Sequence, residues 1–186
     1  MSELIDIKLK DLQKQKAISK LWNMTYEQGI FLSNLIDMKK PKKVLEIGTS
    51  NGFSTLFLAK NLNEGSTIDT IEINEERFTL AKRNFEFCKL ENIKQHLGDV
   101  FGILPALTSK YDFVVVDSVQ SRYLELMDIF VSLDILEKEH ILIFDNVISH
   151  NHNGNLDDFL KYMKDNYIVE LLDLGKGFLF AKSRRF

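Results

Sequence analysis

Apolar residues along the chain follow two spacings in turn, which predict strands that alternate with helices. Short apolar runs typical of strands fall at residues 44–47, 67–73, 93–97, 111–116 and 140–144. Apolar residues recur at helical spacing at 26–38, 52–60, 75–90, 121–136 and 156–165, and an earlier helical segment precedes these. The last part, 168–182, holds two short apolar runs around Gly175 and Gly177, which favours an antiparallel hairpin.

Strands that alternate with helices of this length imply a mostly parallel sheet with helices on both faces. The 186 residues contain two prolines and show no repeat, so we expect a single α/β domain. In such sheets a ligand binds beyond the carboxyl ends of the strands, where the strand order reverses. The residues that directly follow each strand are therefore the first candidates for chemistry.

Charge and composition narrow the class of partner. The formal net charge is −3, so the chain lacks the overall basic field that draws proteins to nucleic acid. Its lone cysteine, Cys88, cannot form an intrachain disulfide and is expected to be a buried thiol. The sequence shows neither a signal-peptide pattern nor the roughly 20-residue apolar run of a membrane helix. We therefore expect a cytoplasmic protein with no membrane partner.

The loop after the first strand has the composition of a ligand-binding turn. Gly48 and Gly52 permit a tight turn and a close approach of the backbone to a ligand. Glu46, just before them, suits a cationic ligand better than a pyrophosphate. Glu72 ends the second strand, where a carboxylate can accept hydrogen bonds from both hydroxyls of a ribose, although an exposed acid is the simpler alternative. Asp99, after the third strand, could bind an adenine amino group or cap the next helix.

A dinucleotide-binding dehydrogenase is the alternative for this half of the chain. Its fingerprint is Gly-x-Gly-x-x-Gly, and the spacing of Gly48, Ser50 and Gly52 does not fit it. The loop therefore favours a cationic, nucleoside-type ligand over a dinucleotide.

Three oxygen-bearing side chains follow the fourth and fifth strands. Asp117 ends the very apolar fourth strand, and Asp145 and Asn146 end the fifth. The carboxyl ends of parallel strands meet at one edge of a sheet, so these side chains are expected to converge. Hard oxygen ligands suit Mg²⁺ or Ca²⁺ rather than Zn²⁺. Either aspartate alone could instead cap a helix, but the three together favour a metal site.

The chain resembles the cation-dependent O-methyltransferases, the group of catechol and caffeoyl-CoA O-methyltransferases and their bacterial relatives. The segments that carry the resemblance are LEIGTSNGFS at 45–54, TIEIN at 70–74, Gly98-Asp99, VVVDSVQSRY at 114–123 and FDNVI at 144–148. The resemblance implies a Rossmann-like class I methyltransferase fold: a seven-stranded, mostly parallel sheet with a C-terminal antiparallel hairpin. Residues 1–40 would form a helical lid on a core at 41–186.

Carried over position by position, the resemblance assigns cofactor and metal residues. S-adenosylmethionine would be held by Glu46, Gly48, Ser50, Gly52, Ser54, Glu72, Asp99 and Asp117. Asp117, Asp145 and Asn146 would ligate Mg²⁺ or another divalent cation. Two neighbouring oxygens of the acceptor would chelate that metal, which lowers the pKa of a bound hydroxyl so that an oxyanion can attack the methyl group.

Position 120 departs from the family pattern. The family usually places a Lys three residues after the first metal-binding Asp, as a base or an orienting cation, and this chain has Gln120, which cannot take up a proton. Losing a positioned base typically costs roughly 10²–10⁴ in rate. His150 and His152 follow the metal-binding loop and titrate in the right range, so one of them could replace the Lys or bind the acceptor. A solvent-exposed polar loop is the simpler alternative.

Three functions follow from these assignments. The leading expectation is O-methylation of a small hydroxylated acceptor by an S-adenosylmethionine-dependent enzyme, with a second copy of the chain as a candidate partner in a homodimer. The second is a binding module that keeps the cofactor site and has lost catalysis, which Gln120 favours. The third is methylation of a modified tRNA nucleoside. Basic residues that could contact RNA are Lys39, Lys40, Lys42, Lys43, Arg184 and Arg185, although the acidic net charge favours a solvated surface and makes nucleic acid the less expected partner.

Overall fold

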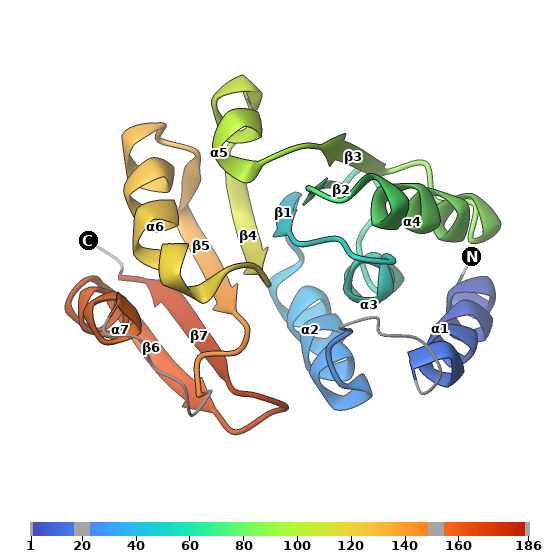
Figure 1. Cartoon of the computed structure of the whole chain (residues 1–186), viewed down its shortest axis with the longest axis horizontal. Coiled ribbons are helices and arrows are strands. Elements are labelled where there is room, and N and C mark those ends of the chain that lie inside the picture. The colour runs from blue at the N-terminus through green and yellow to red at the C-terminus, as the bar shows by residue number, and fades with distance from the viewer. Residues whose placement is uncertain (1, 17–22, 149–154, 185–186) are drawn as a thin grey trace.

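The computed structural model describes residues 2–16, 23–148 and 155–184 of the chain. Its centre is a seven-stranded sheet in the order β3-β2-β1-β4-β5-β7-β6 (Figure 1). The strands are β1 (Lys43–Ile47), β2 (Thr67–Glu72), β3 (Ile93–Leu97), β4 (Tyr111–Val116), β5 (Leu136–Phe144), β6 (Tyr167–Leu172) and β7 (Phe178–Ser183). Strands β1 to β5 are parallel, and β7 is antiparallel to both β5 and β6. This confirms the expected fold class, including the terminal hairpin.

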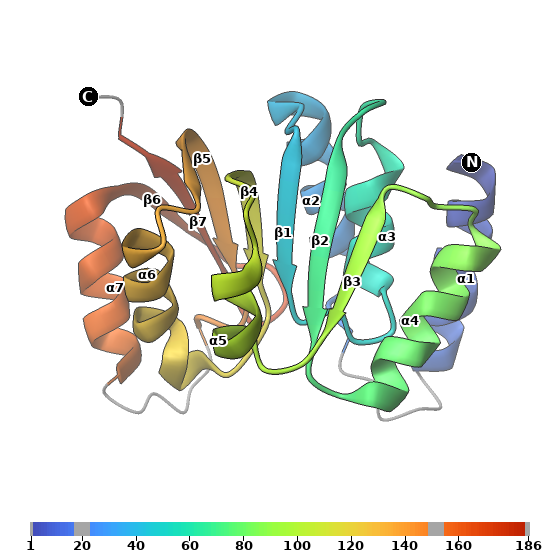
Figure 2. The same ribbon diagram turned by 90° about the horizontal axis from the view of Figure 1, so that it is seen from above.

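Helices cover both faces of the sheet (Figure 2). One face packs against α1 (Ser2–Lys16), α2 (Tyr26–Lys39), α3 (Phe53–Lys60) and α4 (Glu75–Phe87); the other packs against α5 (Val100–Ile103), α6 (Tyr123–Ser132) and α7 (Asn155–Asn166). Successive residues of β4 alternate between the two apolar cores: Phe113 and Val115 join the first, and Val114 and Val116 the second. The uninterrupted apolar run of this strand follows from its burial on both faces.

The largest difference from the expected elements lies between α6 and β5. The pattern predicts one helix over 121–136, whereas a 3₁₀ turn (Gln120–Arg122) precedes α6, which ends at Ser132. Asp134 then adopts the left-handed conformation with φ 51°, and β5 begins four residues earlier than predicted. The early part of β5, Leu136–Glu139, is largely exposed and highly charged. It therefore lacks the apolar run on which the strand prediction depended.

The two N-terminal helices are packed into the same core as α3. Leu9 of α1 and Leu32 of α2 are fully buried there. A capping box begins α2, in which the Thr25 side chain and the backbone N–H of Gln28 are paired, as are the Gln28 side chain and the backbone N–H of Thr25. That these helices act as a lid stays a prediction. In the described parts of the chain, no helix combines the length and apolarity needed to cross a bilayer.

Candidate active site

The loops that follow β1 to β5 and the β6–β7 turn meet around one cavity at the carboxyl edge of the sheet. Its volume is about 610 Å³. The lining side chains include those expected from the strand ends, together with others from the hairpin and from the segment after β3. They include Gly48, Ser50, Glu72, Asp99, Phe101, Asp117, Gln120, Arg122, Asn146 and Lys176. Glu46, Gly52 and Ser54 do not belong to the described lining; they lie behind the loop.

Gly48 brings the first loop against the end of β4. Its backbone has φ +100°, and a Cβ there would lie 2.1 Å from the backbone oxygen of Asp117. The N–H of Asp117 in turn donates to the oxygen of Ile47 at 2.8 Å. The absence of a side chain at position 48 thus allows the ligand loop and the candidate metal ligand to approach each other.

Gly52 has a packing role besides the role that the resemblance implies. It caps α3 with φ +84°, and a Cβ would lie 2.5 Å from the ring of Phe85 on α4. The packing of α3 against α4 therefore requires a residue without a side chain at position 52. The assignment of Gly52 to the cofactor site stays a prediction.

Glu46 forms the buried support of the first loop. Only 1% of its surface is exposed, and its carboxylate accepts hydrogen bonds from Ser54 (2.6 Å), Thr55 (2.5 Å) and Thr70 (2.6 Å). Burial raises the pKa of Glu46 to about 7, against the opposing effect of the three hydroxyl donors. The side chain thereby joins β1, β2 and the start of α3 beneath the cavity.

Glu72 holds the same loop from the second strand. One carboxylate oxygen accepts the N–H of Ser50 at 2.7 Å, and the other accepts the N–H of Asn74 at 2.9 Å. Ser50 itself has a left-handed backbone with φ 49°. Glu72 lines the cavity and is 4% exposed, so it lies where a ribose would be expected while it also fixes the loop.

The segment after β3 adds a wall that the sequence did not reveal. Asp99 caps α5 by accepting the N–H of Phe101 at 3.0 Å, as its alternative interpretation expected. The guanidinium of Arg122 lies 3.6 Å from the centroid of the Phe101 ring and 3.8 Å from Asp99. An aromatic ring and a flat cation thus stand together on the cavity wall beside Asp99, where the base of a nucleoside can pack.

Two of the three candidate metal ligands, Asp117 and Asn146, meet on the cavity wall, whereas Asp145 is 3% exposed and is not part of the described lining. The amide nitrogen of Asn146 donates to a carboxylate oxygen of Asp117 at 3.0 Å, and the backbone N–H of Asn146 donates to Oδ1 of Asp145 at 2.6 Å. Burial raises the pKa of Asp117 to about 7, and the neighbouring carboxylates of Asp145 and Glu46 add to this effect. Carboxylates crowded in this way favour a divalent counter-ion, so the donor set fits Mg²⁺. Among the residues that the structure describes, no group of three or more His, Cys, Asp or Glu side chains lies close enough together to hold a metal ion.

The catalytic candidates are only partly described. Gln120 lines the cavity, and its amide nitrogen donates to the backbone oxygen of Asn146 at 2.5 Å, which links the loops after β4 and β5. His150 and His152 lie outside the described residues. Their proposed roles stay predictions.

Gln28 is a site residue that sequence reasoning missed. Besides its part in the capping box, its amide nitrogen donates to Oδ1 of Asp145 at 2.9 Å and to the oxygen of Leu174 at 3.2 Å. The spacing Thr25-x-x-Gln28 signals the start of a helix, but it carries no information about the distant carboxylate.

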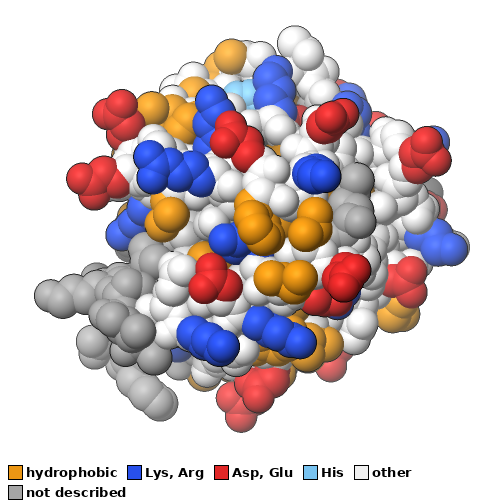
Figure 3. All heavy atoms as spheres, turned by 90° about the vertical axis from the view of Figure 1, so that its right-hand side faces the viewer, with side chains coloured by type: hydrophobic (Ala, Val, Ile, Leu, Met, Phe, Trp, Pro, Cys, Tyr) orange, Lys and Arg blue, Asp and Glu red, His pale blue; other side chains and the backbone are white. Residues whose placement is uncertain are grey.

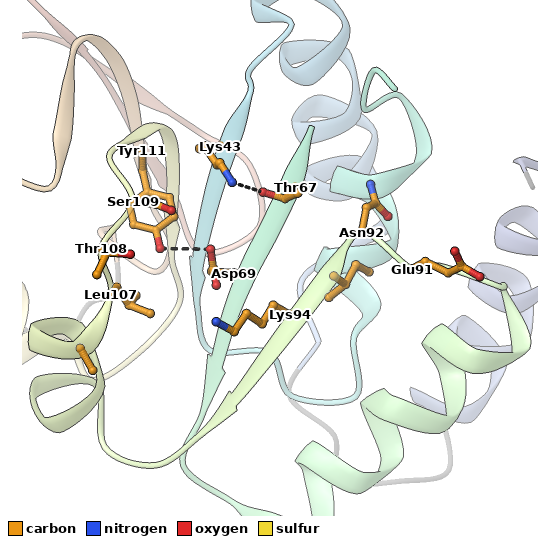
Figure 4. Close-up of a pocket in the computed structure, with 12 residues that line it drawn as sticks. Lys43, Thr67, Asp69, Glu91, Asn92, Lys94, Leu107, Thr108, Ser109 and Tyr111 are labelled. Atoms are coloured by element: carbon orange, nitrogen blue, oxygen red, sulfur yellow. Dashed lines mark hydrogen bonds between the residues drawn. The ribbon is translucent and has the colours of Figure 1, made fainter. Parts of the chain in front are cut away.

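A second, smaller cavity of about 250 Å³ lies at the opposite ends of the strands (Figure 4). Its main polar feature is buried Asp69, which is paired with His96 at 2.7 Å and accepts a hydrogen bond from Tyr111 at 3.1 Å. Burial and the Asp69 charge raise the pKa of Tyr111. These contacts join β2, β3 and β4, so the network is accounted for by its role in holding the sheet together.

The sequence and structure match known proteins. A family model described as O-methyltransferase matches residues 2–174. Catechol O-methyltransferase of Bos taurus is 29% identical over 158 residues, which are 81% of this chain and 57% of that enzyme. Caffeoyl-CoA O-methyltransferase 2 of Petunia hybrida is 25% identical over 165 residues, or 81% of this chain and 67% of that enzyme. The chain thus spans less than two thirds of the length of the bovine relative.

Solved structures share the fold along nearly the whole chain. The O-methyltransferase from Bacillus cereus in complex with SAH has a TM-score of 0.84 at 21% identity, covering 95% of this chain and 90% of that one. TomG from Streptomyces achromogenes, in complex with SAM, has a TM-score of 0.81 at 20% identity, covering 98% and 90%. Because the family model spans almost the entire chain, the chain belongs to the O-methyltransferase family.

Proposed function

We propose that this chain binds S-adenosylmethionine in the 610 Å³ cavity and transfers its methyl group to a hydroxyl oxygen of a small acceptor, with a divalent metal beside the reacting oxygen. The observation that carries the proposal is the contact between the Gly48 loop and Asp117, which places the cofactor loop next to the candidate metal ligands. Two relatives of known structure carry SAH or SAM, which supports the choice of cofactor.

The cavity offers a separate wall for each part of the cofactor. Glu72 would accept hydrogen bonds from the ribose hydroxyls, and Asp99 with Phe101 would flank the adenine. The loop from Gly48 to Ser50 would hold the methionine end, supported from below by Glu46. The sulfonium would then lie near Asp117, whose negative charge favours a cation.

In the transfer, an acceptor oxygen forms a bond to the methyl carbon while the carbon–sulfur bond breaks. The electron pair goes to sulfur, which becomes a neutral thioether, and the hydroxyl proton leaves to a base or to water. Asp117, Asp145 and Asn146 would hold Mg²⁺, which would lower the pKa of the acceptor hydroxyl. The chain's own contribution is alignment, because a methyl transfer in a fixed line gains most from holding the reactants together.

A small acceptor is favoured over RNA by the net charge of the chain and by the mixed charges on one of its faces. On the face that bears α1 and α4, acidic and basic side chains are interspersed (Figure 3). The described part of that face therefore offers no continuous basic surface for a phosphate backbone, and the net charge of the chain is −3.

Two measurements test the proposal. Calorimetry is expected to show binding of S-adenosylmethionine, and labelled methyl groups are expected to reach a catechol when Mg²⁺ is present and not when a chelator is added. Asp117→Asn is expected to reduce transfer at least 100-fold and to weaken Mg²⁺ binding, whereas Asp128→Asn on α6 serves as the control. Binding without transfer would instead identify a cofactor-binding module, and failure to bind the cofactor would reject both functions.

A further inference from the structure

The turn between β6 and β7 carries a lysine into the cavity. Lys176 is flanked by Gly175 and Gly177, and it lines the cavity together with Asp117, Gln120 and Asn146. Its backbone oxygen accepts the N–H of Ile148 at 3.0 Å, next to a bond from Val147 to Gly177 at 3.1 Å. The turn is thus bound to the segment that directly follows Asn146.

The conformation of this turn is constrained from both sides. Gly175 has φ +63°, and a Cβ there would lie 2.5 Å from the side-chain oxygen of Gln28. Gly177 has φ +93°, and a Cβ would lie 2.3 Å from Ile148. Because both neighbours are closely packed, the backbone of Lys176 has little freedom to move away from the cavity.

The reacting end of the cavity carries carboxylates, whose charge has the same sign as that of an oxyanion nucleophile. The carboxylates of Asp145 and Glu46 lie close enough to Asp117 to act on it electrostatically, and an acceptor oxyanion would be repelled by the same charges. A cation near Asp117 offsets this repulsion in addition to the proposed metal, and Lys176 lines the cavity together with Asp117, close enough for its charge to act on that carboxyl.

The other basic side chains of the described lining lie elsewhere. Arg122 is paired with Glu125 at 2.8 Å and stacks on Phe101, beside the expected adenine position. Arg77 belongs to the first turn of α4, after β2. Among the described lining residues, Lys176 is therefore the cation on the side of Asp117 and Asn146.

We propose that Lys176 is a positioning residue for methyl transfer: its ammonium group holds the acceptor oxygen as an oxyanion against the carboxylates of the site. The inference rests on the proposed methyl transfer. It makes Lys176 a positive charge beside the reacting oxygen rather than a proton acceptor.

The test uses the full chain with 4-nitrocatechol, which reports its own ionisation by its visible absorption and can also accept a methyl group. Lys176→Met is expected to lower kcat 10- to 100-fold with a smaller change in KM. It is also expected to raise the apparent pKa of the bound probe by about one unit, because the oxyanion loses the nearby positive charge. One unit of pKa corresponds to about 1.4 kcal/mol of interaction with the charged form. Lys176→Arg is expected to stay close to the parent.

Moving the charge separates an electrostatic role from a structural one. Gln120 lines the same side of the cavity, so Lys176→Met combined with Gln120→Lys is expected to recover at least part of kcat and of the probe's ionisation. Binding of S-adenosylmethionine and of Mg²⁺ is expected to be retained in Lys176→Met, since a positive charge near the metal ligands is removed. Lys182→Met, on the exposed face of β7, is the matched control.

The possible outcomes distinguish failure of the Lys176 role from failure of the proposed methyl transfer. Parent-like kcat and probe ionisation in Lys176→Met would reject the role of Lys176 while leaving methyl transfer intact. Loss of cofactor binding in the same variant, without recovery by Gln120→Lys, would show a structural role and would also reject it. A parent chain that neither binds nor methylates the probe would reject both, because the Lys176 role requires an acceptor at this site.

Discussion

Gly48 and Gly65 share a left-handed backbone but differ in what surrounds them. Gly48 has φ +100°, and a Cβ added there would lie 2.1 Å from the backbone oxygen of Asp117. Gly65 has φ +80°, and a Cβ added there would have no atom within 4 Å. We expect Gly65→Ala to cost about 1 kcal/mol from backbone strain alone. Gly48→Ala adds a steric clash and is expected to cost about 3 kcal/mol, measured as the free energy of unfolding in urea. Equal losses in the two variants would contradict the close approach of the loop to β4.

Glu72 tests whether a residue that fixes the loop also governs the cofactor. Both of its carboxylate oxygens accept backbone N–H groups, so Glu72→Gln would place an amide NH₂ against one of these donors. We expect the affinity for S-adenosylmethionine to fall at least tenfold in calorimetry, since an unpaired buried donor costs about 1–3 kcal/mol. Glu75→Gln, in the exposed first turn of α4, is expected to bind like the parent. Parent-like binding by Glu72→Gln would remove this residue from the cofactor site.

At the scale of elements, the site depends on contacts between segments far apart in the sequence. Gln28 of α2 joins the end of β5 to the β6–β7 turn through Asp145 and Leu174. We expect Gln28→Leu to lower the free energy of unfolding by about 3 kcal/mol, because Asp145 and Leu174 lose a donor. Hydrogen exchange is expected to show loss of protection at residues 174–177.

Glu27→Gln provides the comparison for Gln28, because the neighbouring side chain is exposed on the same helix. It is expected to leave both the unfolding free energy and the protection of residues 174–177 close to the parent values. If Gln28→Leu also left the turn protected, the hairpin would be held mainly by its bonds to Val147 and Ile148.

The contacts between elements also show how much of the site could be predicted from the sequence. Asp117 and Asn146 were expected to meet because strand ends of a parallel sheet share an edge, and their side chains are 3.0 Å apart. The placement of Gln28 and Lys176 depends on how α2 and the terminal hairpin pack across the sheet. The contacts of Gln28 with Asp145 and Leu174 span more than 100 residues, and Lys176 contacts a loop that follows another strand, so no local spacing encodes either placement. The start of β5 was missed for a simpler reason, since its first residues are charged and exposed.

For the whole molecule, buried carboxyls predict an unusual dependence of stability on pH. Burial raises the pKa of Glu46 from 4.5 to about 7. Between these values the folded chain keeps a proton that the unfolded chain has released, so Glu46 contributes stability that is complete below about pH 4.5 and lost as the pH rises through about 7. The stability contributed by Glu46 therefore falls as the pH rises, whereas the stability contributed by a carboxylate in an ion pair rises with pH.

Glu46→Gln isolates this contribution, because the amide stays neutral across the window while it keeps similar size. In the ligand-free chain, the unfolding free energy of the parent minus that of the variant is expected to fall between pH 4.5 and 8, by up to about 3 kcal/mol for a shift of this size. Glu76→Gln, on the exposed first turn of α4, is expected to give a flat difference. A difference for Glu46→Gln that stayed flat or rose with pH would mean that the three hydroxyl donors outweigh burial, and that Glu46 remains ionised beneath the cofactor loop.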